Sequence, residues 1–503
     1  MKRIVTICLL SALAVISASA DGRRLRHPGG CLTAEEAAFT RSVSGLSSLQ
    51  LKGEVRVPII LTAFADVPFT VENVQQVWDD IANKPGYAEH GARGSMRDYF
   101  LEQSRGQFNV TFDVIGPVTL SKPCEYYGGG RSDRYIDKMI QEAATLAADL
   151  PGADFSRYDW DGDGTIETVL VVYAGCGENV KGAPEELIWP KSGLTWGSAG
   201  GYRLSWYACS NELLWPDKRQ DGFGTLLHEF SHCLGLPDLY NVNGNVEDYI
   251  YFDEWDLMDG GCYASGGWQP VGYSAYERYF CGWLEPEELS QTTDVDNMKP
   301  LTDGGQAYMV RNETNSRELF LLENRQQQGF DNLLPGHGLL ITHFTDFGNT
   351  TLSPNDGATL TIMPVPADGL DYLESLRQYV QQHYGITLPN DQHNLTDEYK
   401  TLRYDENGRS RLLTGMAYPT GSDHAALLTK SLTDIREVDS LISFRLMDTA
   451  DGIFLPRKEE GGTRKEERTG LYYDLHGRRI VSPAPASISI LRFSDGTVKK
   501  VIR

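Results

Sequence analysis

The chain has 503 residues and is acidic, because 69 Asp and Glu residues oppose 46 Lys and Arg residues and leave a formal net charge of −23. The sequence shows no basic run or stripe, which argues against nucleic-acid binding and against attraction to anionic membranes. With 41% hydrophobic residues over this length, we expect two or more folding units, each with its own core.

The first twenty residues, 1–20, have the pattern of a secretory signal peptide. Lys2 and Arg3 precede an apolar run that is too short to span a bilayer, and Ala18-Ser19-Ala20 offers a small-residue cleavage site. Cys8 lies inside the apolar run and not at its end, which argues against lipoprotein processing. We therefore expect a secreted or cell-surface protein with no transmembrane segment.

Residues 21–54 precede the first clear strand and are predicted to be a pro-segment, which would make the protein a zymogen. A thiolate at Cys31 in this segment could occupy an open position on a metal ion; an ordinary structural cysteine is the alternative. Beyond the signal peptide the chain has seven cysteines. Because that number is odd, at least one thiol stays unpaired if the others form disulfides.

From residue 55 to residue 285, apolar strands alternate with helical stretches, which is typical of an α/β domain with a substantial core. The clearest strands are predicted at 57–64 and 168–174. The clearest helices are predicted at 134–149 and 222–235.

A loop just before the second of these strands has carboxylates at alternating positions and a glycine, Gly164, at its sixth position. That pattern folds oxygen atoms around one hard cation, as in an EF-hand. The twelfth position is Leu170 and not the glutamate of a full EF-hand, so we predict an abbreviated calcium loop that braces a sheet. The candidate ligands are Asp159, Asp161, Asp163, Thr165 and Glu167. The alternative is a solvated Asp-Gly turn.

The clearest chemical signal is the stretch that runs from His228 to His232. On an α-helix, residues four apart project in nearly the same direction, so these two imidazoles can bind one metal ion. Glu229 lies about 100° around the helix from His228, which is too far for a ligand but suits contact with a metal-held water. Zinc with a neighbouring glutamate is the arrangement that peptide hydrolysis needs.

A third ligand follows the helix closely in the sequence. Gly235 permits a sharp exit from the helix, and Pro237 prevents its continuation, so the chain can turn back. Asp238 would then reach the same ion, with the fourth zinc position open to water. A carboxylate or histidine from elsewhere in the chain is the competing third ligand. The other alternative is that the two histidines are surface residues that bind no metal.

The spacing matches the extended metzincin pattern, with Asp238 where most metzincins have histidine. Beyond this helix, the chain resembles the immune inhibitor A family of secreted bacterial metalloproteases. The stretches that carry the resemblance are 57–61, 96–100, 104–108, 159–164, 228–238, 255–260, 274–278, 282–284, 321–326, 334–340 and 442–444. The resemblance implies an extracellular zinc endopeptidase in which Met258 forms a tight turn beneath the metal. A methionine that fills an ordinary core gap is the alternative for Met258.

From residue 286 to residue 448 the pattern changes to short strands and turns, which predicts either a β-rich companion domain or an elaboration of the protease. The predicted strands are 319–323, 338–344, 359–365 and 441–446, and a helix is predicted at 370–383. Four polar residues stand out in this region and are interpreted as structural or cleft-lining, with direct catalysis as the less favoured role: Glu323, Arg325, His337 and His343.

Residues 449–469 form a charged, glycine-containing linker, and residues 470–503 have short-strand patterning. The tail resembles the C-terminal sorting domains of type IX secretion in Bacteroidetes. It departs from that pattern at Ser487-Ile488-Ser489-Ile490, where a Gly-Ile-Tyr strand is usual, so a small β tail without a sorting role is the alternative.

The predicted fold class is an α/β (α+β) metzincin-like zinc protease domain, followed by a β-rich region and a small β-type tail. The predicted function is a secreted, monomeric zinc endopeptidase that cleaves extracellular proteins or peptides, with Glu229 as general base and then proton donor. Tyr263 is a weak candidate for the oxyanion donor. One alternative is a non-catalytic surface binding protein that retains a structural metal, although such a site has no need of Glu229. Another is a metal-dependent hydrolase that acts on a non-peptide bond.

Overall fold

The computed structural model describes residues 51–129, 135–180, 182–240, 252–347, 361–367, 381, 425–427 and 430–448, together with four short strands between residues 470 and 502. The expected signal peptide, most of the expected pro-segment with Cys31, the helix predicted at 370–383 apart from residue 381, and the linker lie outside the described residues.

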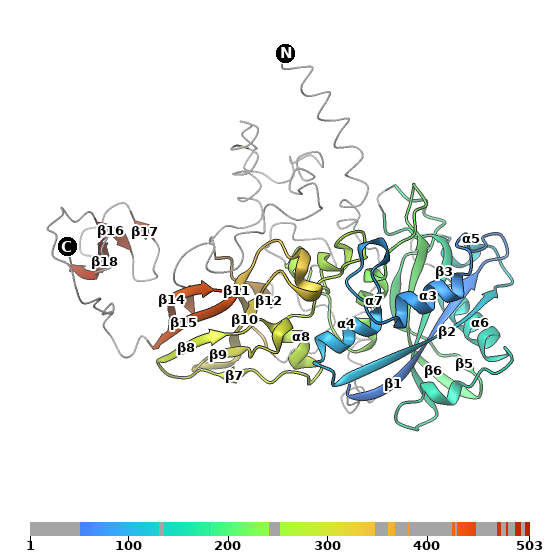
Figure 1. Cartoon of the computed structure of the whole chain (residues 1–503), viewed down its shortest axis with the longest axis horizontal. Helices are drawn as coiled ribbons and strands as arrows, with labels where there is room; N and C mark the ends of the chain where they lie inside the picture. Colours follow the sequence, from blue (N-terminus) through green and yellow to red (C-terminus); the bar gives the residue numbers. More distant parts are fainter. Residues whose placement is uncertain are drawn as a thin grey trace, which may run out of the picture.

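The first domain is built on a six-stranded sheet, seen on the right of Figure 1. Its strands are β1 (Gly53–Ala63), β2 (Phe108–Thr119), β3 (Thr165–Cys176), β4 (Lys191–Leu194), β5 (Ser198–Ala199) and β6 (Tyr202–Leu213). The order is β2-β1-β3-β6-β4, with β5 also paired to β6. The four long strands are parallel, and β4 runs antiparallel beside β6. The strands predicted at 57–64 and 168–174 are confirmed as β1 and β3.

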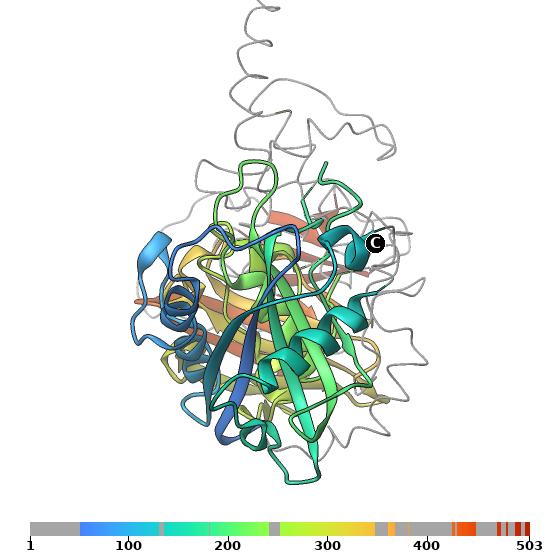
Figure 2. The ribbon, with the colours of Figure 1, turned by 90° about the vertical axis from the view of Figure 1, so that its right-hand side faces the viewer.

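Helices cover both faces of this sheet, because successive residues of its central strands point to opposite sides. On one side, Ile59 and Leu170 pack with α3 (Val74–Asn83), α4 (Met96–Gln103) and α7 (Gly224–Cys233). On the other side, Ile60 and Val171 pack with α5 (Cys124–Gly128) and α6 (Ile136–Ala148). Figure 2 looks onto the face that α6 covers. The predicted helices at 134–149 and 222–235 are confirmed as α6 and α7.

A β-rich region follows the short helix α8 (Ala275–Phe280). One sheet has the order β12-β11-β10-β9-β7, and the other has the order β13-β14-β15-β8. The strands are β7 (Glu287–Glu288), β8 (Thr293–Met298), β9 (Tyr308–Asn312), β10 (Asn315–Arg325), β11 (Gly338–Phe344), β12 (Ile362–Pro364), β13 (Ala425–Leu427), β14 (Lys430–Val438) and β15 (Leu441–Asp448). The short 3₁₀ helices are η2 (Glu89–Gly91), η3 (Phe155–Tyr158), η4 (Asp253–Trp255), η5 (Gly260–Tyr263), η6 (Leu301–Asp303) and η7 (Gly329–Leu333).

Strand β10 has a core on each side. Phe320 and Leu322 pack in the apolar core shared by the two sheets of this region. The alternating residues Leu319 and Leu321 instead belong to the core that also holds α7 and the first sheet. The β-rich region is therefore packed into the first domain and is not a separate body with its own isolated core.

The tail forms an antiparallel sheet of order β17-β16-β18-β19. Its strands are β16 (Gly470–Tyr473), β17 (Arg479–Ile480), β18 (Ile488–Phe493) and β19 (Val498–Ile502). The predicted fold class is thus confirmed: a mixed α/β domain precedes a β-rich region and a small β tail. Among the described helices, none is long and apolar enough to cross a membrane.

Candidate active site

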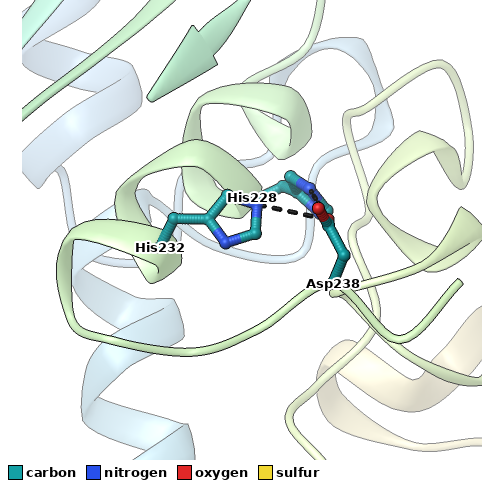
Figure 3. Close-up of side chains that lie close together, drawn as sticks. All are labelled: His228, His232 and Asp238. Carbon is teal, nitrogen blue, oxygen red and sulfur yellow. Dashed lines mark ion pairs between the residues drawn. The ribbon is translucent and has the colours of Figure 1, made fainter. Parts of the chain in front are cut away.

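Helix α7 and the loop that follows it bring His228, His232 and Asp238 together (Figure 3). The Nε2 atoms of both histidines lie 3.2 Å from Oδ1 of Asp238, and all three side chains are buried. In Figure 3 both imidazoles project from the helix toward the aspartate. The three metal ligands predicted from the sequence therefore occupy one place in the structure.

The return of the chain after α7 depends on Gly235. Its φ of 96° lies in the left-handed region, where a residue with a Cβ is strained. The amide of Leu236 then donates to the carbonyl of Ser231, at 3.1 Å, and closes the end of the helix. Three residues later in the loop, the amide of Leu239 donates to the carbonyl of Met258, at 3.0 Å. These bonds fix the loop that carries Asp238.

Each imidazole is oriented by a main-chain carbonyl. Nδ1 of His228 lies 2.9 Å from the carbonyl oxygen of Leu257, and Nδ1 of His232 lies 2.8 Å from that of Leu236. A carbonyl can only accept a hydrogen bond, so each Nδ1 carries the proton when the ring is neutral. Each Nε2 lone pair is then left for a metal, which is the arrangement usual for histidine ligands.

Met258 lies one residue beyond the carbonyl that orients His228. Its side chain is fully buried in the core that includes α7, and its amide donates to Oδ1 of Asp256, at 2.8 Å. The residue therefore occupies the tight turn beside the histidines that the resemblance implies, and it also fills the core as the alternative interpretation has it.

The three ligand atoms fit zinc in kind and in spacing. Zinc takes nitrogen and oxygen ligands at about 2.0–2.1 Å in tetrahedral geometry, which places two ligand atoms about 3.3 Å apart. The two nitrogen–oxygen distances of 3.2 Å agree with that value. Burial acts against the charge on Asp238, but the two imidazoles outweigh it and lower the pKa of the carboxyl group, so that the side chain is anionic.

Glu229 follows His228 on α7 and does not belong to the cluster of His228, His232 and Asp238. It is partly exposed, and the side chain of Ser192 on β4 interacts with it. Burial raises the pKa of Glu229, while the two imidazoles and Ser192 act in the opposite direction. A carboxylate with a raised pKa beside a metal site suits proton transfer better than metal binding.

Several neighbours of the site could not be found by motif. Ser192 comes from an edge strand, and the ring of Tyr240 lies 6.5 Å from that of His228. Cys262 on η5 contacts His228, and the six cysteines that the structure describes are buried. No local sequence signal links these residues to the helix. Tyr263, the candidate oxyanion donor, lies partly exposed at the end of η5.

In the predicted calcium loop, Asp159, Asp161 and Glu167 have carboxylate oxygens within 4.8 Å of one another. Burial raises the pKa of Glu167 to about 7. The other two candidates face Arg203, whose guanidinium donates to Oγ1 of Thr165 at 2.8 Å and lies 3.8 Å from Asp163. The loop thus brings together three of the five predicted side chains.

Comparison with known proteins agrees with this geometry. Residues 69–283 match the family described as immune inhibitor A peptidase M6, catalytic domain. The metalloprotease precursor PrtV of Vibrio cholerae is 26% identical over 289 aligned residues, and the match covers 47% of this chain and 31% of that protein. Immune inhibitor A of Bacillus thuringiensis is 26% identical over 235 aligned residues, and the match covers 39% of this chain and 33% of that protein. A protein of Arthroderma benhamiae, named as a secreted metallopeptidase, is 23% identical over 270 aligned residues, and the match covers 43% of this chain and 39% of that protein.

The chain thus spans between 31% and 39% of the length of these relatives. The matched region contains α7, all three clustered ligand residues and Glu229. Residues 69–283 are therefore similar to the catalytic domain of the immune inhibitor A peptidases, and these matches support a hydrolase of the metalloendopeptidase class.

Proposed function

We propose that the protein is a secreted zinc-dependent endopeptidase that cleaves extracellular proteins or peptides. One observation carries the proposal: His228, His232 and Asp238 converge in a buried cluster whose spacing fits zinc, with Glu229 beside it on the same helix. The match of residues 69–283 to a peptidase catalytic domain supports the same class of reaction.

A zinc ion held by the three ligands would polarise the peptide carbonyl and acidify a water molecule. Glu229 would then serve as general base toward that water and afterwards as proton donor to the departing amine. A carboxylate suits this double role, because it can both accept a proton and release it. Leu257 and Leu236 keep the two imidazoles in the tautomer that binds the metal.

A binding protein with a structural metal is the weaker alternative. Structural zinc sites use four protein ligands and leave no open position. Among the described residues, the cluster supplies three, and a carboxylate that is not a ligand stands next to it. Three ligands and a free acid are the composition of a catalytic site.

Removal of the metal tests the proposal directly. We expect the purified protein to contain about one zinc ion per chain and to cleave casein, because three ligands suffice for tight binding. A chelator should abolish cleavage, and zinc should restore it. Zinc content is measured by atomic emission and cleavage by release of labelled peptides. Full cleavage by metal-free protein would contradict the proposal.

We also propose that Asp159, Asp161 and Glu167 bind a structural calcium ion. Calcium at about 100 times its dissociation constant would stabilise the fold by about 2.7 kcal/mol and raise Tm by several degrees. The variant Asp161→Asn should lose most of that increase, whereas Asp149→Asn, an exposed residue outside the loop, should keep it. Thermal unfolding with calcium and with chelator gives the measurement. An equal calcium effect in both variants would place the ion elsewhere.

The division of the chain is proposed on the sequence evidence: a signal peptide at 1–20, a pro-segment at 21–54, a catalytic domain at 55–285 with a β-rich part at 286–448, and a linker before a tail with a sorting role. Export is supported by the relative whose name describes a secreted metallopeptidase. We propose that the mature enzyme acts as a monomer.

A further inference from the structure

A buried group of charged side chains lies behind the tight turn that contains Met258. Asp256 and Glu277 are both fully buried, and their carboxyl groups face each other at hydrogen-bonding range. Arg325, also fully buried, is close enough to influence Asp256. The proposed reaction does not use these groups, yet burying charge is costly unless it is paired.

Asp256 shapes the turn that orients His228. Its Oδ1 accepts from the amide of Met258 at 2.8 Å, and its carbonyl accepts from the amide of Gly261 at 2.9 Å. Between these two bonds lies Leu257, whose carbonyl oxygen is 2.9 Å from Nδ1 of His228. A shift of Asp256 would therefore move the Leu257 carbonyl, which orients the imidazole of the proposed zinc ligand His228.

Among the described residues, Oδ2 of Asp256 and Oε1 of Glu277 have no hydrogen-bond partner unless one of the two groups carries a proton. The nearby hydroxyl of Ser274 has one proton to give, and it donates to Oε2 of Glu277 at 3.1 Å. Two buried carboxylates in contact cannot both be charged, so one proton between them satisfies both atoms. Burial and the nearby Asp256 raise the pKa of Glu277 well above its usual value. The proton therefore resides on Glu277, which donates it to Asp256.

Glu277 is itself held from two directions. Its Oε2 accepts from the amide of Ser274 at 2.6 Å, in the capping box that starts α8. The next amide, that of Ala275, donates to Glu323 of β10 at 2.9 Å. Two residues further along β10, Arg325 donates to the carbonyl of Gly272 at 3.1 Å. Strand β10 lies beyond residue 283, where the family match ends, so the β-rich region fixes the position of Glu277.

We propose that Glu277 is a positioning residue of the zinc site, whose carboxylic acid holds Asp256 and, through it, the Leu257 carbonyl on His228. This inference rests on the proposed function. Glu277 itself contacts neither substrate nor metal. The site requires its side chain in the neutral, protonated form, which can donate a hydrogen bond to Asp256.

The test compares Glu277→Gln with Glu277→Met. The amide of glutamine can still donate to Asp256 and accept from Ser274, whereas the methionine side chain fills a similar volume without either bond. We expect Glu277→Gln to bind zinc as the wild-type protein does. Glu277→Met should bind zinc about tenfold or more weakly, as other losses of an outer-shell partner do.

Zinc affinity is measured by competition with a coloured chelator well below Tm, and the absorption spectrum of the cobalt-substituted protein reports the ligand geometry. Asp98→Ala is the matched control, because Asp98 closes a capping box at the start of α4 as Glu277 does at α8, and it belongs to a helix that carries no proposed ligand. We expect this control to lower Tm while its zinc affinity and cobalt spectrum stay unchanged.

Two results would overturn the role of Glu277: wild-type zinc affinity in Glu277→Met, or a loss in Glu277→Gln as large as that in Glu277→Met. Neither result would contradict the proposed function as long as the wild-type protein binds zinc and cleaves casein. If the wild-type protein bound no zinc, the proposed function would fail first.

Discussion

Replacement of Glu229 by glutamine is expected to abolish casein cleavage while zinc stays bound. Glutamine has the size and shape of glutamate but cannot accept a proton at neutral pH. General acid–base catalysis contributes about 10²–10⁴-fold to rate, which corresponds to about 3–5 kcal/mol of transition-state stabilisation. Because Glu229 lies outside the cluster of ligand atoms, the zinc content of the variant should equal that of the wild-type protein.

The assay measures kcat/KM on casein and zinc per chain on the same preparation. Glu125→Gln serves as the control, since Glu125 is an exposed glutamate on α5 and that helix packs on the opposite face of the sheet from α7. Unchanged cleavage in Glu229→Gln would mean that another group is the base. Lost zinc would mean that Glu229 helps to hold the metal. Either outcome would change the assignment of the site.

The parts of this fold that the sequence predicts are those with a strong local period. Strands β1 and β3 are runs of buried β-branched residues, and α6 and α7 have apolar residues at helical spacing, so each needs only its own segment to be recognised. Strand β6 was not predicted. It carries the buried polar residues Asn211 and Glu212 near its end. Asn211 donates to the carbonyl of Leu213 and to Asp221, and Glu212 also has its partners inside the fold.

Glu212 is a residue whose burial depends on partners from distant parts of the chain. Its carboxylate accepts hydrogen bonds from the amides of Thr70, Val71 and Gly175, at 2.8, 3.0 and 3.0 Å, on segments far apart in the chain. Such a residue is predicted to be exposed from its type alone, since a buried carboxylate is unfavourable without partners. Only the folded chain shows those partners.

In the candidate site, too, some residues can be predicted from the local sequence and others only from the fold. The two histidines, Glu229 and Asp238 lie within eleven consecutive residues, so helix geometry and a turn suffice to predict that the two imidazoles and Asp238 meet, with Glu229 on the same helix. Their support comes from elsewhere: Ser192 is 37 residues before Glu229, and Leu257 is 29 residues after His228. For Glu323 and Arg325, the structural interpretation agrees with their burial, since both are at most 1% exposed. Glu323 accepts from the first amide of α8, and Arg325 donates to the carbonyl of Gly272 just before that helix.

The second large effect is expected at Asp238. Replacement by alanine removes one of three ligands and should weaken zinc binding by more than the roughly 10–100-fold that loss of an outer-shell partner costs. Asp238→Asn should also bind weakly, because its amide oxygen lacks the negative charge that the two imidazoles stabilise in the aspartate. Asp238→His should recover much of the affinity, since imidazole is a common zinc ligand and many metzincins have histidine at this position.

Zinc competition titrations on the three variants decide the matter, with Asp217→Asn as an exposed control on the turn after β6. If Asp238→Ala kept wild-type affinity, the third ligand would come from a different part of the chain, and the 3.2 Å contacts to the two imidazoles would be simple ion pairs. If Asp238→Ala and Asp238→Asn lost zinc and Asp238→His regained it, the position itself would be the ligand site. The order of zinc affinities among the three variants separates metal binding from a general loss of stability. If the variants were only unstable, histidine at this position would have no reason to restore zinc binding where asparagine fails to do so.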